Sequence, residues 1–113
     1  VFFDPSGLDA HNVSTSKEMA IIANEAFHTQ ELAARCGAAE AAISVHGEKG
    51  NRVIQIKNRN HSLLRFNPEA SKTGFLVEAQ RTAVLKKDGK IIVVLHARSM
   101  NERNGIILRM IKP

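Results

Sequence analysis

A lysine, a small hydroxyl residue and a glycine follow one another at Lys72, Thr73 and Gly74. The Lys72 ammonium can pair with a carboxylate, and the Thr73 hydroxyl can donate a hydrogen bond to the same group. Gly74 has no side chain, so another backbone can approach it closely. A strand edge of this kind can receive an extended, anionic peptide as an additional strand. Taken alone, however, the tripeptide more often marks a solvated turn or strand end.

Three other segments precede the tripeptide and give it a context. In chain order the set is 3–9 (FDPSGLD), 14–20 (STSKEMA), 58–64 (NRNHSLL) and 71–75 (SKTGF). These residues and their order resemble the penicillin-binding serine D-alanyl-D-alanine carboxypeptidases and endopeptidases, which trim peptidoglycan and carry Lys-Thr-Gly as their last signature. The SKTGF form, followed by Val77, Glu78 and Ala79, is closest to the endopeptidase branch.

The resemblance implies roles for particular residues. Lys72 and Thr73 would bind the terminal carboxylate of a donor peptide or of a β-lactam, and the backbone N–H of Phe75 would be one of two oxyanion-hole donors. The remaining positions expected at the substrate are Gly74, Arg59, Asn60 and Arg103. The chain departs from the family at Leu76, where threonine is common, and at Gln80, where glycine is usual.

The nucleophile is not among these residues. In the family a serine, activated by a lysine, attacks the peptide carbonyl and forms an acyl-enzyme that water cleaves. Ser14 to Lys17 is formally Ser-x-x-Lys and Ser99 to Asn101 is formally Ser-x-Asn, but their order is wrong and helix capping accounts for both serines. The resemblance therefore places the nucleophile before Val1 and makes residues 1–113 the carboxy-terminal part of a catalytic domain.

The first half of the chain predicts two helices and a hairpin. Ser14 or Thr15 can cap a helix, and Thr15 with Glu18 has capping-box spacing. The apolar face of this helix is expected to hold Met19, Ile22, Ala23, Ala26 and Phe27. A short helix over 30–35 and two strands over 42–45 and 52–57 should follow, with a loop over 46–51. Residues 58–70 should be irregular because Pro68 opposes regular pairing.

The second half predicts a sheet and a final helix. Strands are expected over 71–78, 80–87 and 90–98, with a tight turn at 88–89. The run 91–95 is apolar on both faces, which indicates an interior strand. Ser99 and Glu102 should open a helix that places Arg103, Ile107, Met110 and Ile111 on one face. With the resemblance, the fold class is α+β: an antiparallel sheet with helices, part of the three-layer α/β/α fold of β-lactamases and DD-peptidases.

Composition narrows the partners. Hydrophobic residues make up 43% of the 113 residues and charged residues 24%, which is typical of a globular domain. The formal charge is +5, but the basic residues are scattered, which favours a solvated surface over nucleic-acid binding. The five histidines show no metal-ligand spacing, and Cys36 has no partner cysteine, so we expect no metal site, no cofactor and a packing role for Cys36.

Two functions remain open at this point. The first is the substrate-binding half of a periplasmic or otherwise extracytoplasmic DD-peptidase, whose ligands are peptidoglycan stem peptides and β-lactams. The second is a non-catalytic module that binds the same peptides. Either requires a partner for the run 91–95, because an uncovered apolar strand edge is a template for pairing. We expect that partner to be the missing amino-terminal half or a second copy of the chain.

The chain alone is expected neither to hydrolyse D-Ala-D-Ala peptides nor to be acylated by penicillin, because it has no correctly placed Ser-x-x-Lys. Incubation with a fluorescent penicillin, followed by a denaturing gel, measures the acylation. A covalent label on Ser14 would contradict this prediction.

Overall fold

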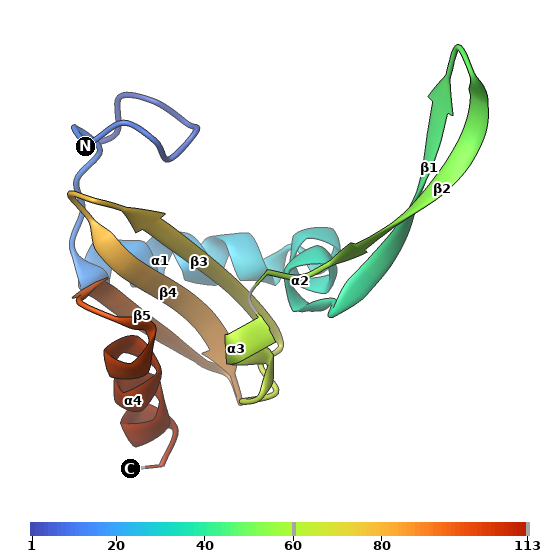
Figure 1. Cartoon of the computed structure of the whole chain (residues 1–113). Helices are drawn as coiled ribbons and strands as arrows, with labels where there is room; N and C mark the ends of the chain where they lie inside the picture. Colours follow the sequence, from blue (N-terminus) through green and yellow to red (C-terminus); the bar gives the residue numbers. More distant parts are fainter. Residues whose placement is uncertain (60, 113) are drawn as a thin grey trace.

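A computed structural model describes residues 1–59 and 61–112. The chain has a mixed α+β architecture with two antiparallel sheets, as Figure 1 shows. The elements are, in chain order, α1 (Ser16–His28), α2 (Gln30–Gly37), β1 (Glu40–Gly47), β2 (Gly50–Lys57), α3 (His61–Leu64), β3 (Ala70–Leu76), β4 (Gln80–Lys87), β5 (Lys90–Ala97) and α4 (Met100–Ile111). The fold class predicted from the sequence is therefore confirmed.

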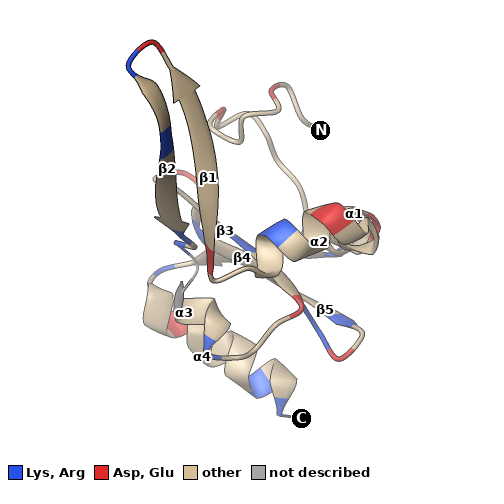
Figure 2. Cartoon of the chain, turned by 90° about the vertical axis from the view of Figure 1, so that its right-hand side faces the viewer, with Lys and Arg blue, Asp and Glu red and all other residues tan. Residues whose placement is uncertain are grey.

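The larger sheet has the order β3-β4-β5 and is covered on both faces. Helix α4 lies on one side and α1 on the other, as the two views in Figures 1 and 2 agree. Because side chains alternate along a strand, β4 contributes to two separate cores. The core on the α4 side holds Leu63, Ala83, Leu85, Ile92, Val94, Ala97 and Ile107, and the core on the α1 side holds Ala23, Phe27, Ala70 and Val84.

Helix α1 begins where the sequence predicts. The Thr15 hydroxyl accepts a hydrogen bond from the Glu18 N–H at 3.2 Å, so Thr15 is the cap, and the expectation that capping accounts for Ser14 is wrong. Ala23 and Phe27 are buried, as expected, but 45% of Ile22 is exposed, so its place on the buried face was predicted wrongly. The sheet covers a narrower stripe of the helix than the apolar spacing indicates.

The β1–β2 hairpin is longer than predicted. Its register pairs His46 with Asn51 and Gly47 with Gly50, so the connecting loop contains two residues and not the six predicted. Cross-strand pairing extends through these polar residues because the tight turn keeps the strands in register. The hairpin projects away from the larger sheet (Figure 1).

The segment 58–70 is not wholly irregular. Residues 61–64 form the short helix α3, and Leu63 of this helix is fully buried in the core on the α4 side. Pro68 did exclude a strand, but it does not prevent a helical turn that ends four residues before it. Burial of one leucine therefore decides the local structure here.

The strands of the larger sheet follow the prediction closely. β4 has the predicted bounds, and β3 and β5 end two residues and one residue earlier than predicted. Asp88 and Gly89 have φ values of 50° and 77°, as a type I′ hairpin turn requires. Strand β5 is covered on both faces, as its apolar run indicates, but in the described part of the chain it has only one strand neighbour.

Helix α4 is capped by Ser99, whose hydroxyl accepts a hydrogen bond from the Glu102 N–H at 3.1 Å. Arg103 and Ile107 are buried and Ile111 is half-buried. Met110 is 48% exposed, so the expected four-residue face lacks this member. Within the described residues, no helix has the length and apolar character that crossing a lipid bilayer requires.

Helix α2 ends against the start of β3, and this contact leaves no room for a side chain at Gly37. A Cβ atom built there would lie 2.4 Å from the Glu69 carbonyl oxygen, well inside van der Waals contact. We therefore expect Gly37→Ala to destabilise the fold by about 1–3 kcal/mol, the usual cost of overpacking. Thermal or urea unfolding measures the change.

Gly105→Ala is the matched control, because Gly105 lies inside α4 with no atom within 4 Å of the added Cβ. Removing a helical glycine should stabilise the protein by roughly 0.5–1 kcal/mol. Equal effects of the two substitutions would show that the contact between Gly37 and Glu69 is unimportant.

Candidate functional site

One edge of β3 has no neighbouring strand in the described part of the chain. The Thr82 hydroxyl donates to the Gly74 carbonyl oxygen at 3.2 Å, so this carbonyl points toward β4. Peptide groups of successive strand residues point to opposite sides, so the N–H and C=O of Thr73 and Phe75 point away from β4. A ligand strand on this edge would therefore find backbone donors and acceptors directed toward it.

The Lys72 ammonium lies at the same edge. Its Nζ donates a hydrogen bond to the Thr73 carbonyl oxygen, which is one of the groups that point away from β4. The Lys72 side chain is exposed, and no carboxylate of the described residues pairs with it. The ammonium is thus accessible to an anionic ligand that lies along β3.

Gly74 also avoids crowding within the sheet. A Cβ atom at this position would lie 3.0 Å from the Thr82 hydroxyl oxygen, which is tighter than ordinary contact. Gly74 and Thr82 are register partners, so their side chains would share one face of the sheet. This crowding within the fold is a structural reason for glycine, in addition to the close approach of a ligand proposed from the sequence.

A pocket of about 310 Å³ opens where α2 ends, the hairpin begins and β3 begins; we call it the basal pocket. Its lining includes four basic residues and a single acidic one: Arg35, Lys57, Arg59, Lys72 and Glu40. The excess of positive charge attracts anions into the pocket. Figure 2 shows basic residues around the base of β2.

The structure brings two of the predicted site residues together here. Arg59 and Lys72 both line the basal pocket, together with Ser71 and Cys36. Asn60, which was also predicted to line the cleft, lies outside the described residues. No local sequence signal indicates Arg35 or Lys57, because α2 and the hairpin reach the pocket only through the tertiary fold.

Arg103 lies elsewhere. It is 4% exposed, and its guanidinium donates to the Ser62 hydroxyl at 3.0 Å and to the Asn104 side-chain oxygen at 3.1 Å. Burial lowers the pKa of Arg103, and the nearby positive charge of Arg81 lowers it further. The basal pocket does not include Arg103, so the structure does not bring it together with Lys72.

The Phe75 side chain on β3 contacts Arg81 on β4. The Arg81 guanidinium lies 4.8 Å from the centre of the Phe75 ring, a distance typical of a cation–π interaction. Phe75 and Arg81 are register partners at the end of the β3–β4 ladder. This contact fixes the ring, which is 57% exposed, beside the peptide N–H that the resemblance implies is an oxyanion donor.

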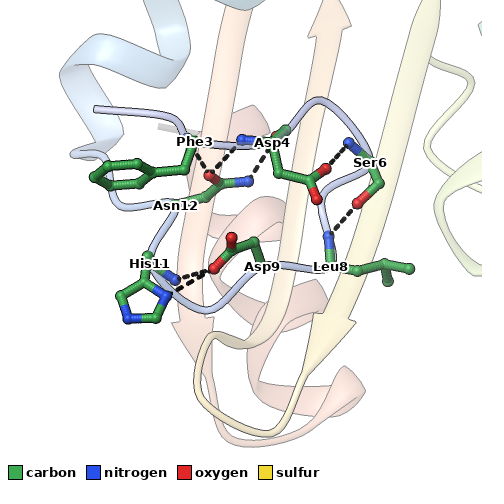
Figure 3. A network of polar contacts seen from close by, with 7 residues as sticks. All are labelled: Phe3, Asp4, Ser6, Leu8, Asp9, His11 and Asn12. Atoms are coloured by element: carbon green, nitrogen blue, oxygen red, sulfur yellow. Dashed lines mark hydrogen bonds and ion pairs between the residues drawn. The ribbon is translucent and has the colours of Figure 1, made fainter.

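The amino-terminal segment closes on itself through the Asn12 side chain (Figure 3). Its amide oxygen accepts hydrogen bonds from the N–H groups of Phe3 and Asp4, and its amide nitrogen donates to the Asp4 carbonyl oxygen. Hydrogen bonds from Ser6 lower the pKa of the Asp4 carboxyl. Hydrogen bonds from the His11 backbone and ring likewise lower the pKa of Asp9.

This closed segment lies against the far end of the larger sheet. A cavity of about 420 Å³ separates it from the sheet and is lined by Gly7, Asp9, Leu76 and Thr82, among others. Gly7 and Asp9 of the segment 3–9 thus face the same cavity as Leu76, the residue that directly follows the segment 71–75. The spacing of the segments in the sequence could not predict that proximity.

Gln80 adopts a backbone conformation that favours glycine. Its φ is 56°, and its side-chain oxygen is buried without a hydrogen-bond partner among the described residues. The family resemblance leads one to expect glycine at this position, and the left-handed conformation supplies the physical reason. Gln80 therefore occupies a left-handed position that glycine adopts with the least strain.

Metal ligation finds no support in the described residues, where no group of three or more His, Cys, Asp and Glu side chains is placed to hold an ion. Cys36 is a half-buried free thiol that packs beside the core on the α1 side. The site therefore consists of a strand edge, a cationic pocket and the side chains that support them.

No protein-family model and no curated protein sequence matches the chain. Among solved structures, the chain is similar to the crystal structure of D-alanyl-D-alanine carboxypeptidase from Mycobacterium tuberculosis H37Rv, with a TM-score of 0.68 and 19% sequence identity. The match covers 93% of this chain and 44% of the carboxypeptidase chain. The similarity shows a fold like that of part of a DD-peptidase domain, and the chain spans less than half the length of that protein.

Proposed function

We propose that residues 1–113 form the substrate-holding part of the catalytic domain of a serine DD-peptidase. The fold similarity and the ordered segments 3–9, 14–20, 58–64 and 71–75 support this proposal. The observation that carries it is the position of the Lys72 ammonium, which lies beside outward-pointing peptide groups on the edge of β3 that has no neighbouring strand in the described residues. Few arrangements other than the binding of an extended, anionic peptide use all of these groups.

In this proposal the substrate peptide pairs with the open edge of β3. Its carboxylate accepts hydrogen bonds from the Lys72 ammonium and the Thr73 hydroxyl, and the absence of a side chain at Gly74 lets its backbone lie close. The carbonyl oxygen of the cleavable bond then reaches the Phe75 N–H, which stabilises the negative charge that develops on it.

The nucleophilic serine and its lysine belong to a part of the catalytic domain outside these residues. The serine oxygen bonds to the carbonyl carbon, the C–N bond breaks, and the leaving amine takes up a proton. Water then hydrolyses the ester and regenerates the serine. A β-lactam would acylate the same serine and place its carboxylate on Lys72 and Thr73. Such an enzyme works on peptidoglycan and would be periplasmic or extracytoplasmic.

Arg59 and Arg103 have different places in this proposal. Arg59 adds positive charge to the basal pocket next to Lys72. Arg103 joins α4 to the segment after Arg59 through a hydrogen bond to the Ser62 hydroxyl, so it helps to position that segment. Direct contact between Arg103 and a carboxylate stays a prediction from the resemblance.

The test of the carboxylate contact is Lys72→Ala. We expect the chain to lose about 1.5–3 kcal/mol of binding free energy for a labelled peptide that ends in D-Ala-D-Ala with a free carboxylate. The same peptide with an amidated end should lose little. Fluorescence anisotropy measures both affinities, and Lys90→Ala, at the opposite edge of the sheet, is the control with the same loss of charge. Equal losses for the two peptides would refute the contact.

The outer edge of β5 needs a partner as well. Ile92 and Val94 are buried and Ile91 and Val93 are half-buried, so the strand is apolar on both faces although it has one strand neighbour in the described residues. We propose that a strand from the remainder of the domain, or β5 of a second copy, pairs with this edge. The isolated chain should accordingly sediment as a dimer at low micromolar concentration. A compact monomer that melts cooperatively would contradict this proposal.

A further inference from the structure

The β1–β2 hairpin has one apolar face. Directly opposed residues share a face, and residues alternate between faces along each strand. The register therefore places five apolar residues together, Ala41, Ile43, Val45, Ile54 and Ile56, and the same face ends near the turn with Arg52 opposite Val45. The other face is mainly polar and carries Glu40, Ala42, Ser44, His46, Asn51, Val53, Gln55 and Lys57. We call the five-residue set the apolar face of the hairpin.

The rest of the described chain leaves this face open. Ile43 is 44% exposed and Ile56 is 45% exposed, and the strands β1 and β2 pack mainly against each other. Figures 1 and 2 show the hairpin standing away from the larger sheet. A two-stranded hairpin is at best marginally stable alone, and an exposed apolar surface commonly marks a site of interaction.

The apolar face continues into the basal pocket. Ala41 and Ile56 belong to the face and also line the pocket, where Arg35, Arg59 and Lys72 supply positive charge. A cationic pocket thus opens onto an apolar strip about 14 Å long, given the four steps of roughly 3.4 Å from Ala41 to Val45. The ligand that complements both is an extended peptide with several carboxylates and small apolar side chains, because one terminal carboxylate would not need this many cations.

The direction of the proposed substrate decides which part of it reaches the hairpin. The carbonyl of the cleavable bond lies at Phe75 and the carboxylate of the leaving group at Lys72, so the path from Phe75 to Lys72 runs from the acyl side to the leaving side. Beyond Lys72 and Ser71, the same path enters the basal pocket. The hairpin therefore lies on the leaving-group side of the cleavable bond.

We infer that the basal pocket and the apolar face of the hairpin bind the second peptide strand of a cross-linked substrate. This inference rests on the function proposed above and narrows it. A carboxypeptidase releases a single amino acid, which would occupy Lys72 and leave the hairpin without a ligand. An endopeptidase releases a whole peptide strand, and a strip of this length and polarity fits such a strand.

The experiment compares two probes by fluorescence anisotropy with the full 113-residue chain. The first is a labelled linear peptide that ends in D-Ala-D-Ala with a free carboxylate. In the second probe, a diamino dicarboxylic acid takes the place of the last D-Ala. This residue is part of a second, unlabelled peptide, and one of its carboxylates lies beside the cleavable bond as the terminal carboxylate does in the first probe. We expect the cross-linked probe to bind about tenfold more tightly, which corresponds to covering about one isoleucine side chain.

Ile43→Ser should remove most of this preference, because Ile43 lies on the apolar face. Val53→Ser is the matched control, since Val53 lies on the opposite face of the same hairpin and is 65% exposed. It should leave the preference unchanged.

The outcomes separate the two proposals. Equal affinity for both probes, with both lost in Lys72→Ala, would overturn the hairpin inference and leave the proposed function intact. A preference that survives Ile43→Ser would also overturn it. If neither probe binds, or if Lys72→Ala leaves the affinity for both probes unchanged, the proposed function is refuted, and the hairpin inference is refuted with it.

Discussion

In the described part of the chain β3 pairs with β4 on one side only, and the candidate site depends on this constraint. Because Gly74 directs its carbonyl to Thr82, the peptide groups of Thr73 and Phe75 must point the other way. Because side chains alternate between faces, the side chains of Lys72 and Thr73 leave β3 on opposite faces of the sheet. They can both contact one carboxylate only if it lies beside the edge of the strand. The Lys72 ammonium already lies over that edge on the Thr73 carbonyl oxygen.

Two close contacts hold this edge in place relative to its surroundings. The end of α2 approaches the backbone of Glu69 so closely that only glycine fits at position 37, and this sets α2 and the hairpin beside the first residues of β3. On the other face, Arg103 ties α4 to Ser62, just after the segment that brings Arg59 to the basal pocket. The pocket therefore forms where α2 and the segment after β2 are each held by one of these contacts.

Much of the fold could be predicted from local signals. The caps at Thr15 and Ser99, the turn at Asp88 and Gly89 and the run 91–95 each have a physical cause within a few residues, and each was identified. The misses involve causes that act at a distance. Helix α3 exists because Leu63 is buried in a core made by later strands, and Ile22 and Met110 are exposed because no neighbouring element reaches them. The site divides in the same way: Lys72 carries a local signature, whereas Arg35 and Lys57 reach the pocket only through the fold.

In both the hairpin and the larger sheet, side chains alternate between two faces along each strand. The faces of the two sheets are covered differently. Every strand of the larger sheet packs against a helix, which accounts for buried residues such as Leu85 and Ile92. In the described part of the chain no helix packs on the hairpin to this extent, so Ile43 and Ile56 are exposed and Ile54 is half-buried. Exposing them costs free energy, since apolar surface is stabilised by removal from water. The binding of an amphipathic, anionic chain that we propose above would remove these isoleucines from water.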